Sequence, residues 1–262
     1  MPSMTTPAAI GEPLPFRAHA ATATLPGLHT LDAIERIAAG VHEPLLGRLL
    51  DDHIQLCPQN RGTLDEAACE ELRARWPSTR FRPHANVRVL PRLRLFDASS
   101  PLADAGHLFD AVATVCQRLQ SPCYTLHAGY RVNASLPEMI DNVMRLQDRF
   151  PCPVGVEGLY PDPQRQQLMD CWSDYERVLC AGVPLAVDLS HLQIVARREG
   201  PCDDLVRALL SSPTTLEVHL SANDGRRDSH DVLRSEPWWW HLRDAIQPRA
   251  TVFSEGNQLR AH

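Results

Sequence analysis

The sequence of 262 residues contains no lysine, and all 26 of its basic residues are arginine. A protein without lysine cannot form a Schiff base through a side-chain amine or use that amine as a general base. Arginine remains available to bind carboxylates or phosphates through its planar guanidinium group. The formal net charge of −6 and the pI near 6.0 argue against a main role in binding nucleic acid, because such proteins carry an excess of positive charge.

Sequence signals of several other protein classes are also missing. No apolar run approaches the roughly 18 residues that a membrane-spanning helix needs. The first 15 residues have neither the basic start nor the apolar centre of a secretory signal. The eight cysteines include no Cys-x-x-Cys pair and lie in apolar or helical stretches, which favours reduced thiols. These features predict a soluble, cytoplasmic protein with a disordered tail over residues 1–15 and a single domain over residues 16–262.

Short apolar runs and segments with helical spacing alternate along the chain. The expected strands cover residues 16–20, 53–57, 80–85, 123–126, 154–156, 185–187, 216–218 and 250–254. The expected helices cover residues 31–39, 44–50, 64–75, 101–120, 136–150, 164–181, 203–211 and 238–246. Alternation of this kind is typical of α/β proteins with a parallel sheet.

Eight repeats of strand and helix favour closure into a (β/α)8 TIM barrel. A doubly wound sheet is the competing architecture, but it should show a Gly-x-Gly-x-x-Gly motif after an early strand, and the sequence has none. Almost no chain follows the eighth strand, so we expect the final helix to be short or missing. A missing helix would leave an apolar flank open for a partner protein or a second copy of the chain.

Most of the later strands end on a side chain that can bind a metal ion. The strand ends of such a barrel converge on one rim, so these side chains should meet there. Acidic residues directly after apolar runs are costly to bury without a positive partner, and few basic residues lie near these strand ends. The nine candidate metal ligands are His84, His127, Glu157, Asp188, His191, His219, Asp228, His230 and Glu255.

The number and type of these residues suggest the composition of the site. Nine ligands are too many for one ion, whose coordination shell takes about four to six, so we expect two or three divalent ions per chain. Mixed histidine and carboxylate ligands suit zinc, manganese or iron. Glu157 and Glu255 follow the fifth and eighth strands, and both could bridge metal ions across the mouth of the barrel. A single histidine at a strand end is more often structural, so the prediction rests on the joint pattern.

Two further features have alternative interpretations. The three tryptophans at positions 238–240 favour a helix that packs its aromatic face on the barrel, with a substrate-stacking wall or a partner surface as alternatives. Arg226 and Arg227 beside Asp228 either clamp an anionic substrate or belong to a solvated loop.

With these residues in place, the sequence resembles the xylose-isomerase-like TIM-barrel superfamily over residues from about 16 to 260. The most specific segment, His219-Leu-Ser-Ala-Asn-Asp224-Gly-Arg-Arg-Asp228-Ser-His230, is similar to the superfamily's strand-seven motif. Asp188-Leu-Ser-His191 is similar to the strand-six motif. The resemblance implies that residues 16–262 form a TIM-barrel catalytic domain.

Four single residues extend this resemblance. Glu157 and Glu255 are similar to the carboxylates of strands five and eight, and His84 and His127 to the two extra histidines of the multinuclear branches. The superfamily includes sugar isomerases and epimerases, apurinic-site endonucleases and multinuclear non-heme iron enzymes that carry out oxidations. The endonucleases carry a longer loop between the strand-seven histidine and the Asp-x-His pair, and the low pI disfavours them further.

The epimerase branch implies one metal ion and a defined set of catalytic residues. That ion would be held by Glu157, Asp188, His219 and Glu255. The two glutamates would move protons, and His191 and an arginine such as Arg226 would hold the substrate. This arrangement leaves His84, His127 and the Asp228-x-His230 pair unexplained.

The iron enzymes are similar to this chain in their crowded ligand set and in an Asp-x-His pair followed by tryptophan. That resemblance implies one iron that binds substrate and a neighbouring ferrous iron that activates dioxygen. We therefore expect oxidative modification of a small molecule or peptide in a biosynthetic pathway, with iron favoured over manganese or zinc. The alternatives are a sugar or sugar-phosphate isomerase or epimerase, an endonuclease-like phosphodiester hydrolase, and a non-catalytic scaffold barrel.

Overall fold

The computed structural model describes residues 16–164 and 166–260, and the tail expected over residues 1–15 lies outside this part of the chain. Within the described residues, eight strands run parallel in one sheet, in the order β5-β4-β1-β10-β9-β8-β7-β6. The strands are β1 (His19–Ala21), β4 (Leu50–Leu56), β5 (Arg80–Pro83), β6 (Tyr124–His127), β7 (Val154–Glu157), β8 (Leu185–Asp188), β9 (Thr215–Leu220) and β10 (Thr251–Ser254).

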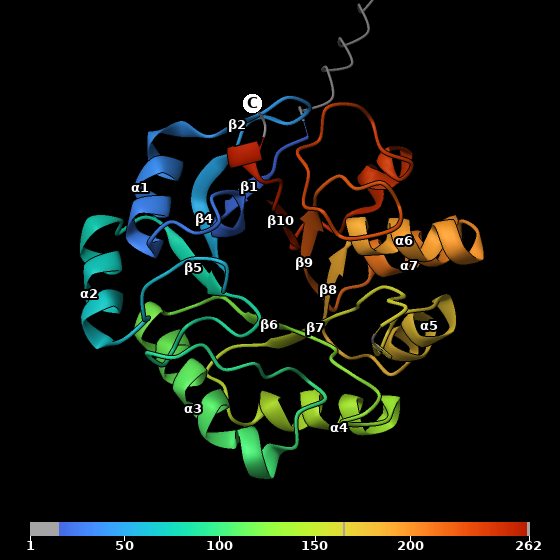
Figure 1. The fold of residues 1–262 in the computed structure, drawn as a ribbon, viewed down its shortest axis with the longest axis horizontal. Helices are drawn as coiled ribbons and strands as arrows, with labels where there is room; N and C mark the ends of the chain where they lie inside the picture. The colour runs from blue at the N-terminus through green and yellow to red at the C-terminus, as the bar shows by residue number, and fades with distance from the viewer. Residues whose placement is uncertain (1–15, 165, 261–262) are drawn as a thin grey trace, which may run out of the picture.

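The α-helices form a ring outside the strands, as Figure 1 shows. They are α1 (Thr30–Gly40), α2 (Glu66–Arg75), α3 (Leu102–Leu119), α4 (Leu136–Gln147), α5 (Trp172–Cys180), α6 (Leu189–Glu199) and α7 (Asp203–Ser211). Helix α4 illustrates why these segments fold in this way. Its residues Leu136, Met139, Val143 and Leu146 recur every three or four positions, so they share one face, and all of them are buried.

The two outer strands of the sheet, β5 and β6, come together and nearly close the barrel. His84 bridges Thr125, the N–H of Ala85 donates to the Thr125 carbonyl at 2.7 Å, and the Tyr124 hydroxyl donates to the Ala85 carbonyl at 2.8 Å. The expected single-domain (β/α)8 architecture is therefore confirmed. After β10 the described residues contain only the 3-10 turn η3 (Gln258–Arg260), so the final helix is short, as expected.

The inside of the barrel contains a polar layer, whereas the space between strands and helices is apolar. One large cluster of buried apolar residues joins the strands to the surrounding helices. In the interior, Glu217 forms hydrogen bonds with Gln55, Arg82 and Thr125, and these four buried residues come from four different strands. The Arg82 guanidinium lies 3.3 Å from the Glu217 carboxylate. Barrel interiors are usually filled by branched apolar side chains, so this layer requires an explanation from the site above it.

The prediction of a helix over residues 44–50 is wrong. The chain there forms a short hairpin of β2 (His42–Glu43) and β3 (Gly47–Arg48) and then enters β4. Gly47 has a φ of +73°, a conformation that ends regular helix and suits a turn. Leu45 and Leu46 pack against the main core from this turn, which explains why the run is apolar without being helical.

The region around α5 and α6 also differs from expectation. The helix expected over residues 164–181 begins only at Trp172, because Gln167 pairs with Tyr130 in an antiparallel bridge and Met169 has a φ of +53°. Helix α6 was not expected. It follows β8 without a linker, and Asp188 caps it by accepting hydrogen bonds from the N–H groups of Ser190 and His191 at 2.6 and 3.1 Å.

The tryptophan segment packs on the barrel, as the favoured interpretation held, but it forms the 3-10 helix η2 (Trp240–Ala245) and no α-helix over residues 238–246. Trp239 is fully buried in the main core, and Trp238 and Trp240 are half-buried beside it. Within the part of the chain that the structure describes, no helix combines the length and apolar character needed to cross a membrane.

Replacing Trp239 tests this packing. We expect Trp239→Ala to lower the free energy of unfolding by about 3–5 kcal/mol, because the substitution leaves a large cavity in a core that cannot fully collapse. Urea denaturation followed by far-ultraviolet circular dichroism measures the change. Val132→Ala is the control, since Val132 is 85% exposed and its loss should stay within about 0.5 kcal/mol. Equal stability of the two variants would contradict the assigned position of Trp239.

Candidate metal centre

Strand register brings the first candidate ligands together. His127 on β6 is paired with Glu157 on β7, and Asp188 on β8 is paired with His219 on β9. Neighbouring strands lie about 4.8 Å apart, and paired residues point to the same side of a sheet. Two pairs of ligands therefore follow directly from the pairing of four parallel strands.

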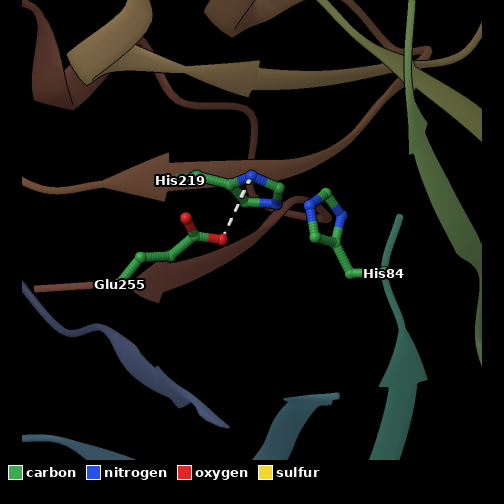
Figure 2. Close-up of side chains that lie close together, drawn as sticks. All are labelled: His84, His219 and Glu255. Atoms are coloured by element: carbon green, nitrogen blue, oxygen red, sulfur yellow. Dashed lines mark ion pairs between the residues drawn. The ribbon is translucent and has the colours of Figure 1, made fainter. Parts of the chain in front are cut away.

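His84, His219 and Glu255 form one compact group, although they come from distant parts of the sequence. His84 follows β5, His219 lies on β9 and Glu255 follows β10. Figure 2 shows the three side chains pointing toward one another, with Nδ1 of His219 3.6 Å from Oε1 of Glu255. One ligand atom from each lies within 4.8 Å of the others, which is close enough to share a metal ion.

Glu157 lies at the centre of the site and contacts four histidines. Its Oε2 is 3.1 Å from Nε2 of His84 and 3.6 Å from Nε2 of His127. Its Oε1 is 3.4 Å from Nδ1 of His191 and 3.5 Å from Nδ1 of His219. Glu157 belongs to two further groups with metal-binding spacing, one with His84 and His127 and one with Asp188 and His191. A carboxylate shared in this way is suited to bridging two ions.

The remaining candidates complete the other side of the site. Nε2 of His191 lies 3.4 Å from both Asp188 and Asp228. His230 contacts Asp228 at 2.9 Å through Nε2 and Glu255 at 3.5 Å through Nδ1. The structure thus brings all nine expected ligands into one connected cluster.

Several ligand atoms in this cluster have no hydrogen-bond partner among the described residues. They are buried and comprise Oε2 of Glu157, Nδ1 of His219, Nδ1 of His230 and Oε1 of Glu255. A buried polar atom without a partner costs about 1–3 kcal/mol, so a bound ligand that contacted these four atoms would remove much of that cost. Because all four carry lone pairs of types that bind divalent metals, the residues fit a metal centre.

Hydrogen bonds behind the histidines fix which ring nitrogen faces the centre. Nδ1 of His84 lies 2.9 Å from the Thr125 hydroxyl, and Nδ1 of His191 lies 2.9 Å from the Gly158 carbonyl. In each ring the Nδ1–H group donates to its oxygen partner, so the lone pair on Nε2 remains free to bind a metal ion. Such outer contacts are typical of metal-binding histidines, because they fix the tautomer and the ring orientation.

Glu217 plays the same role for His219, and the sequence interpretation missed it. Its Oε2 lies 3.2 Å from Nε2 of His219, and it accepts hydrogen bonds from the Thr125 hydroxyl at 2.9 Å and from the Gln55 amide at 3.1 Å. The same Gln55 amide lies 2.7 Å from Nε2 of His219. Burial would raise the pKa of Glu217, but the hydrogen bond from His219 and the charge of Arg82 hold it at about 2. The available signal was the spacing of two residues between Glu217 and His219, which places both side chains on one face of a strand.

The charges of the candidate ligands shift one another's pKa values. Burial would lower the pKa of His219, but Glu157 and Glu255 raise it above its usual range. Burial would raise the pKa of Glu157, but His219 and His84 lower it well below its usual range. For Asp188, burial dominates and raises the pKa to about 6. A divalent cation competes for the same lone pairs, so metal binding would release protons from the cluster.

Seven of the nine candidate ligands line a cavity of about 190 Å³. Small-molecule sites usually measure about 300–1,000 Å³, so this cavity admits one functional group of a substrate rather than a large molecule. Its other walls come from loops that the sequence pattern did not place. They comprise Gln59, Asp97, Gly129, Tyr130, Leu159, Tyr160 and Gln167.

Arg226, which the epimerase resemblance implied as a substrate-holding residue, does not line this cavity. It is exposed in the loop after β9 and lies in the wall of a larger neighbouring cavity. Asp228, two residues further on, faces the cavity of about 190 Å³ that the candidate ligands line, the metal cavity. A fourth group with metal-binding spacing, formed by Asp170, Cys171 and Asp174, lies outside the cluster, and both of its aspartates pair with Arg131.

Comparison with known proteins identifies the fold. No protein-family model and no curated protein matches the sequence. A D-tagatose 3-epimerase-like protein has a TM-score of 0.65 at 14% identity, over 93% of this chain and 91% of that one. AP endonuclease family 2 from Brucella melitensis has a TM-score of 0.60 at 14% identity, over 92% and 93%. The IolI protein, solved with a zinc atom, has a TM-score of 0.58 at 12% identity, over 91% and 88%.

These neighbours are xylose-isomerase-like TIM barrels. The chain has their fold. The resemblance inferred from the strand ends is therefore confirmed at the level of architecture. At identities of 14% and below, the likeness says nothing about which reaction this barrel carries out.

Glu217→Gln tests whether Glu217 orients the centre. The substitution keeps the side-chain volume but removes the negative charge, and we expect metal affinity to fall by about 10–100-fold, the usual cost of losing an outer-shell carboxylate. Competition with a fluorescent chelator measures affinity. Glu176→Gln on the exposed face of α5 is the matched control and should bind metal like the native protein. Unchanged affinity in both variants would mean that Glu217 has only a structural role.

Proposed function

We propose that this chain is a multinuclear metal enzyme that uses iron and dioxygen to oxidise one functional group of a small molecule or a peptide. One observation carries the proposal. Nine histidine and carboxylate side chains form one connected cluster, seven of them line one cavity, and His84 and His127 are more ligands than one ion requires. The structural neighbours, which are enzymes by their names, support a catalytic rather than a scaffold role.

The three overlapping groups suggest how two or three ions would be held. His84, His219 and Glu255 form the first group, and Glu157 contributes to both of the others. Glu157 could therefore offer one oxygen to each of two ions, whereas His84 has one free ring nitrogen and would serve one of them. Bound iron would supply Lewis acidity and redox chemistry with dioxygen.

The chain's own residues would position the substrate and limit the access of water. Tyr160 packs on the His191 ring with their centroids 4.9 Å apart, and the Tyr160 N–H donates to the Gln167 side chain at 3.3 Å. This contact holds the loop after β7 against the ligands. His127 is the most open of the metal-facing histidines that surround Glu157, with 37% of its side chain exposed. A substrate group that enters the cavity would meet the cluster on that side.

A metal-dependent sugar epimerase is the second candidate. Glu157, Asp188, His219 and Glu255 are all present in the cluster, and each of the two glutamates lies within 3.6 Å of Nδ1 of His219. Among the structural neighbours is a D-allulose 3-epimerase from Methylomonas sp. in complex with D-allulose, which shares 15% identity. This reaction would need one ion and would leave His84 and His127 without a role.

Metal content separates these candidates. After anaerobic purification without added metal, we expect two or three irons per chain by inductively coupled plasma mass spectrometry, with a Mössbauer spectrum of coupled high-spin iron. Addition of dioxygen to the ferrous protein should change that spectrum. One manganese, cobalt or zinc per chain would favour the epimerase, and about three zincs would favour phosphodiester hydrolysis. A metal-free protein would leave only the scaffold interpretation.

His127→Ala tests whether the centre is multinuclear. His127 belongs to only one of the three groups, so its removal should lower metal content by about one ion per chain and leave the rest bound. In a single-ion epimerase centre, the same substitution would not change metal content. His107→Ala on the exposed face of α3 is the control for a surface histidine that binds metal adventitiously. A fall of equal size in both variants would contradict the assignment.

A further inference from the structure

A second, larger cavity of about 830 Å³ lies beside the metal cavity. Its size is within the usual range of a site for a whole small molecule. The charged residues in its walls are mostly arginines, in a protein whose net charge is −6. These residues are Arg131, Arg197, Arg198 and Arg226, together with Asp162 and Asp170.

The two cavities share four structural elements, one of which is the loop after β6, with Tyr130 on the metal cavity and Arg131 on the larger one. The loop after β7 places Tyr160 and Gln167 on the metal cavity and Pro161 and Gln166 on the larger one. The loop after β9 divides in the same way, with Asp228 and His230 on the metal side and Gly225 and Arg226 on the other side. The larger cavity is therefore a direct neighbour of the metal cavity.

Helix α6 connects the two sites and sets the distance between them. His191 in its first turn lines the metal cavity, and Ile194, Arg197 and Arg198 line the larger cavity further along. At a rise of 1.5 Å per residue, the seven positions from His191 to Arg198 span about 10 Å. A molecule that reached from one site to the other would need a similar length.

Most of the positive charge in the larger cavity is not neutralised. Arg131 pairs with Asp170 at 2.8 Å and Asp174 at 2.5 Å. Arg197 donates to the backbone carbonyl of Asp224 at 3.1 Å, which does not cancel its charge. Among residues 16–164 and 166–260, no carboxylate forms an ion pair with Arg197, Arg198 or Arg226. Three guanidinium groups around one cavity repel one another, and an anion between them would remove that repulsion.

We propose that Arg197, Arg198 and Arg226 bind a phosphate or carboxylate group of the substrate, about 10 Å from the group that reacts at the metal centre. The inference deepens the proposed function and rests on it for the identity of the reacting end. Guanidinium forks match the paired oxygens of both anions, and a chain without lysine has no other strong cation for this task. The substrate class is therefore an anionic molecule long enough to span both cavities.

Residue-resolved arginine modification tests the site on the native, metal-loaded chain. Phenylglyoxal labels exposed arginines, and peptide mass spectrometry gives the rate at each position. Inorganic phosphate and succinate serve as separate probes, with ionic strength held constant by sodium chloride. At about ten times the dissociation constant, a bound probe should slow labelling of Arg197, Arg198 and Arg226 by about tenfold. The exposed Arg36, Arg145 and Arg207 lie outside both cavities and should label at an unchanged rate.

The outcomes distinguish the source of the anion. Protection by phosphate alone indicates a phosphorylated substrate, protection by succinate alone indicates a carboxylate, and protection by both indicates a site for either group. No protection, or equal slowing at the three control arginines, would overturn the proposal. Labelling reports on the arginines and does not depend on the metal. If the protein contained no iron while phosphate or succinate slowed labelling of the three arginines, the oxidative assignment would be lost and the anion site would remain.

A pair of charge-matched variants gives an independent test. In the triple variant R197Q/R198Q/R226Q, calorimetric titration should show a loss of phosphate or succinate binding of about tenfold or more, at unchanged metal content. The control triple variant R36Q/R145Q/R207Q has the same net charge and should bind like the native chain. Equal binding by both variants would overturn the proposal. If the first variant does not fold, the labelling of the native chain decides the question.

Discussion

The buried carboxylate of Glu157 is the constraint on which the rest of the site depends. It is 1% exposed, and taking a carboxylate out of water costs several kcal/mol unless positive groups or hydrogen bonds compensate. The barrel surrounds Glu157 with histidine nitrogens within 3.6 Å and places no arginine against it among the described residues. A histidine offsets the buried negative charge of Glu157 only when it is protonated, whereas a bound metal ion would offset that charge more completely. A cation bound at this position would therefore offset the cost of burying the carboxylate.

The polar interior of the barrel follows from the same constraint. His84 and His219 reach the centre from strand ends, and each needs a partner below it to fix its ring. Thr125 supplies one partner and Glu217 the other, and the Thr125 hydroxyl also donates to Glu217 at 2.9 Å. Arg82 then balances the charge of Glu217 at 3.3 Å. Part of the usual apolar filling of a barrel is replaced by a hydrogen-bonded layer below the candidate ligands, which fixes their side chains.

The sequence predicts the parts of this site that depend on local pattern. Glu157, Asp188 and His219 end apolar runs, and strand ends in a parallel barrel must converge, so the order of residues along the chain is enough to predict that they meet. Glu217 was hidden because it lies within a run that reads as apolar. Its role depends on Arg82, which is 135 residues away in sequence and approaches only when the barrel closes.

Loop positions were the least predictable feature, because distant contacts determine them. The segment before α5 was expected to be helical, yet a bridge between Tyr130 and Gln167 holds it over the rim. Arg226 lies two residues from Asp228, and the epimerase resemblance implied that it faces the same site, with a solvated loop as the alternative. The loop turns between them, so the aspartate faces the metal cavity and the arginine faces the neighbouring one. Proximity in sequence does not indicate the direction of a side chain in a loop.

The separation of the two cavities has a consequence for catalysis. A cavity of 190 Å³ crowded with ligands offers little surface for binding a substrate. Contacts remote from the reacting atoms can supply that binding energy and hold the reacting group in place without occupying the metal ligands. Helix α6 carries His191 at one end and Arg197 and Arg198 near the other, so the proposed binding site and the proposed reaction centre would be fixed to one rigid element. An anion bound at the arginines would therefore set the depth at which the rest of the molecule enters the metal cavity, and the length of α6 would select the substrate.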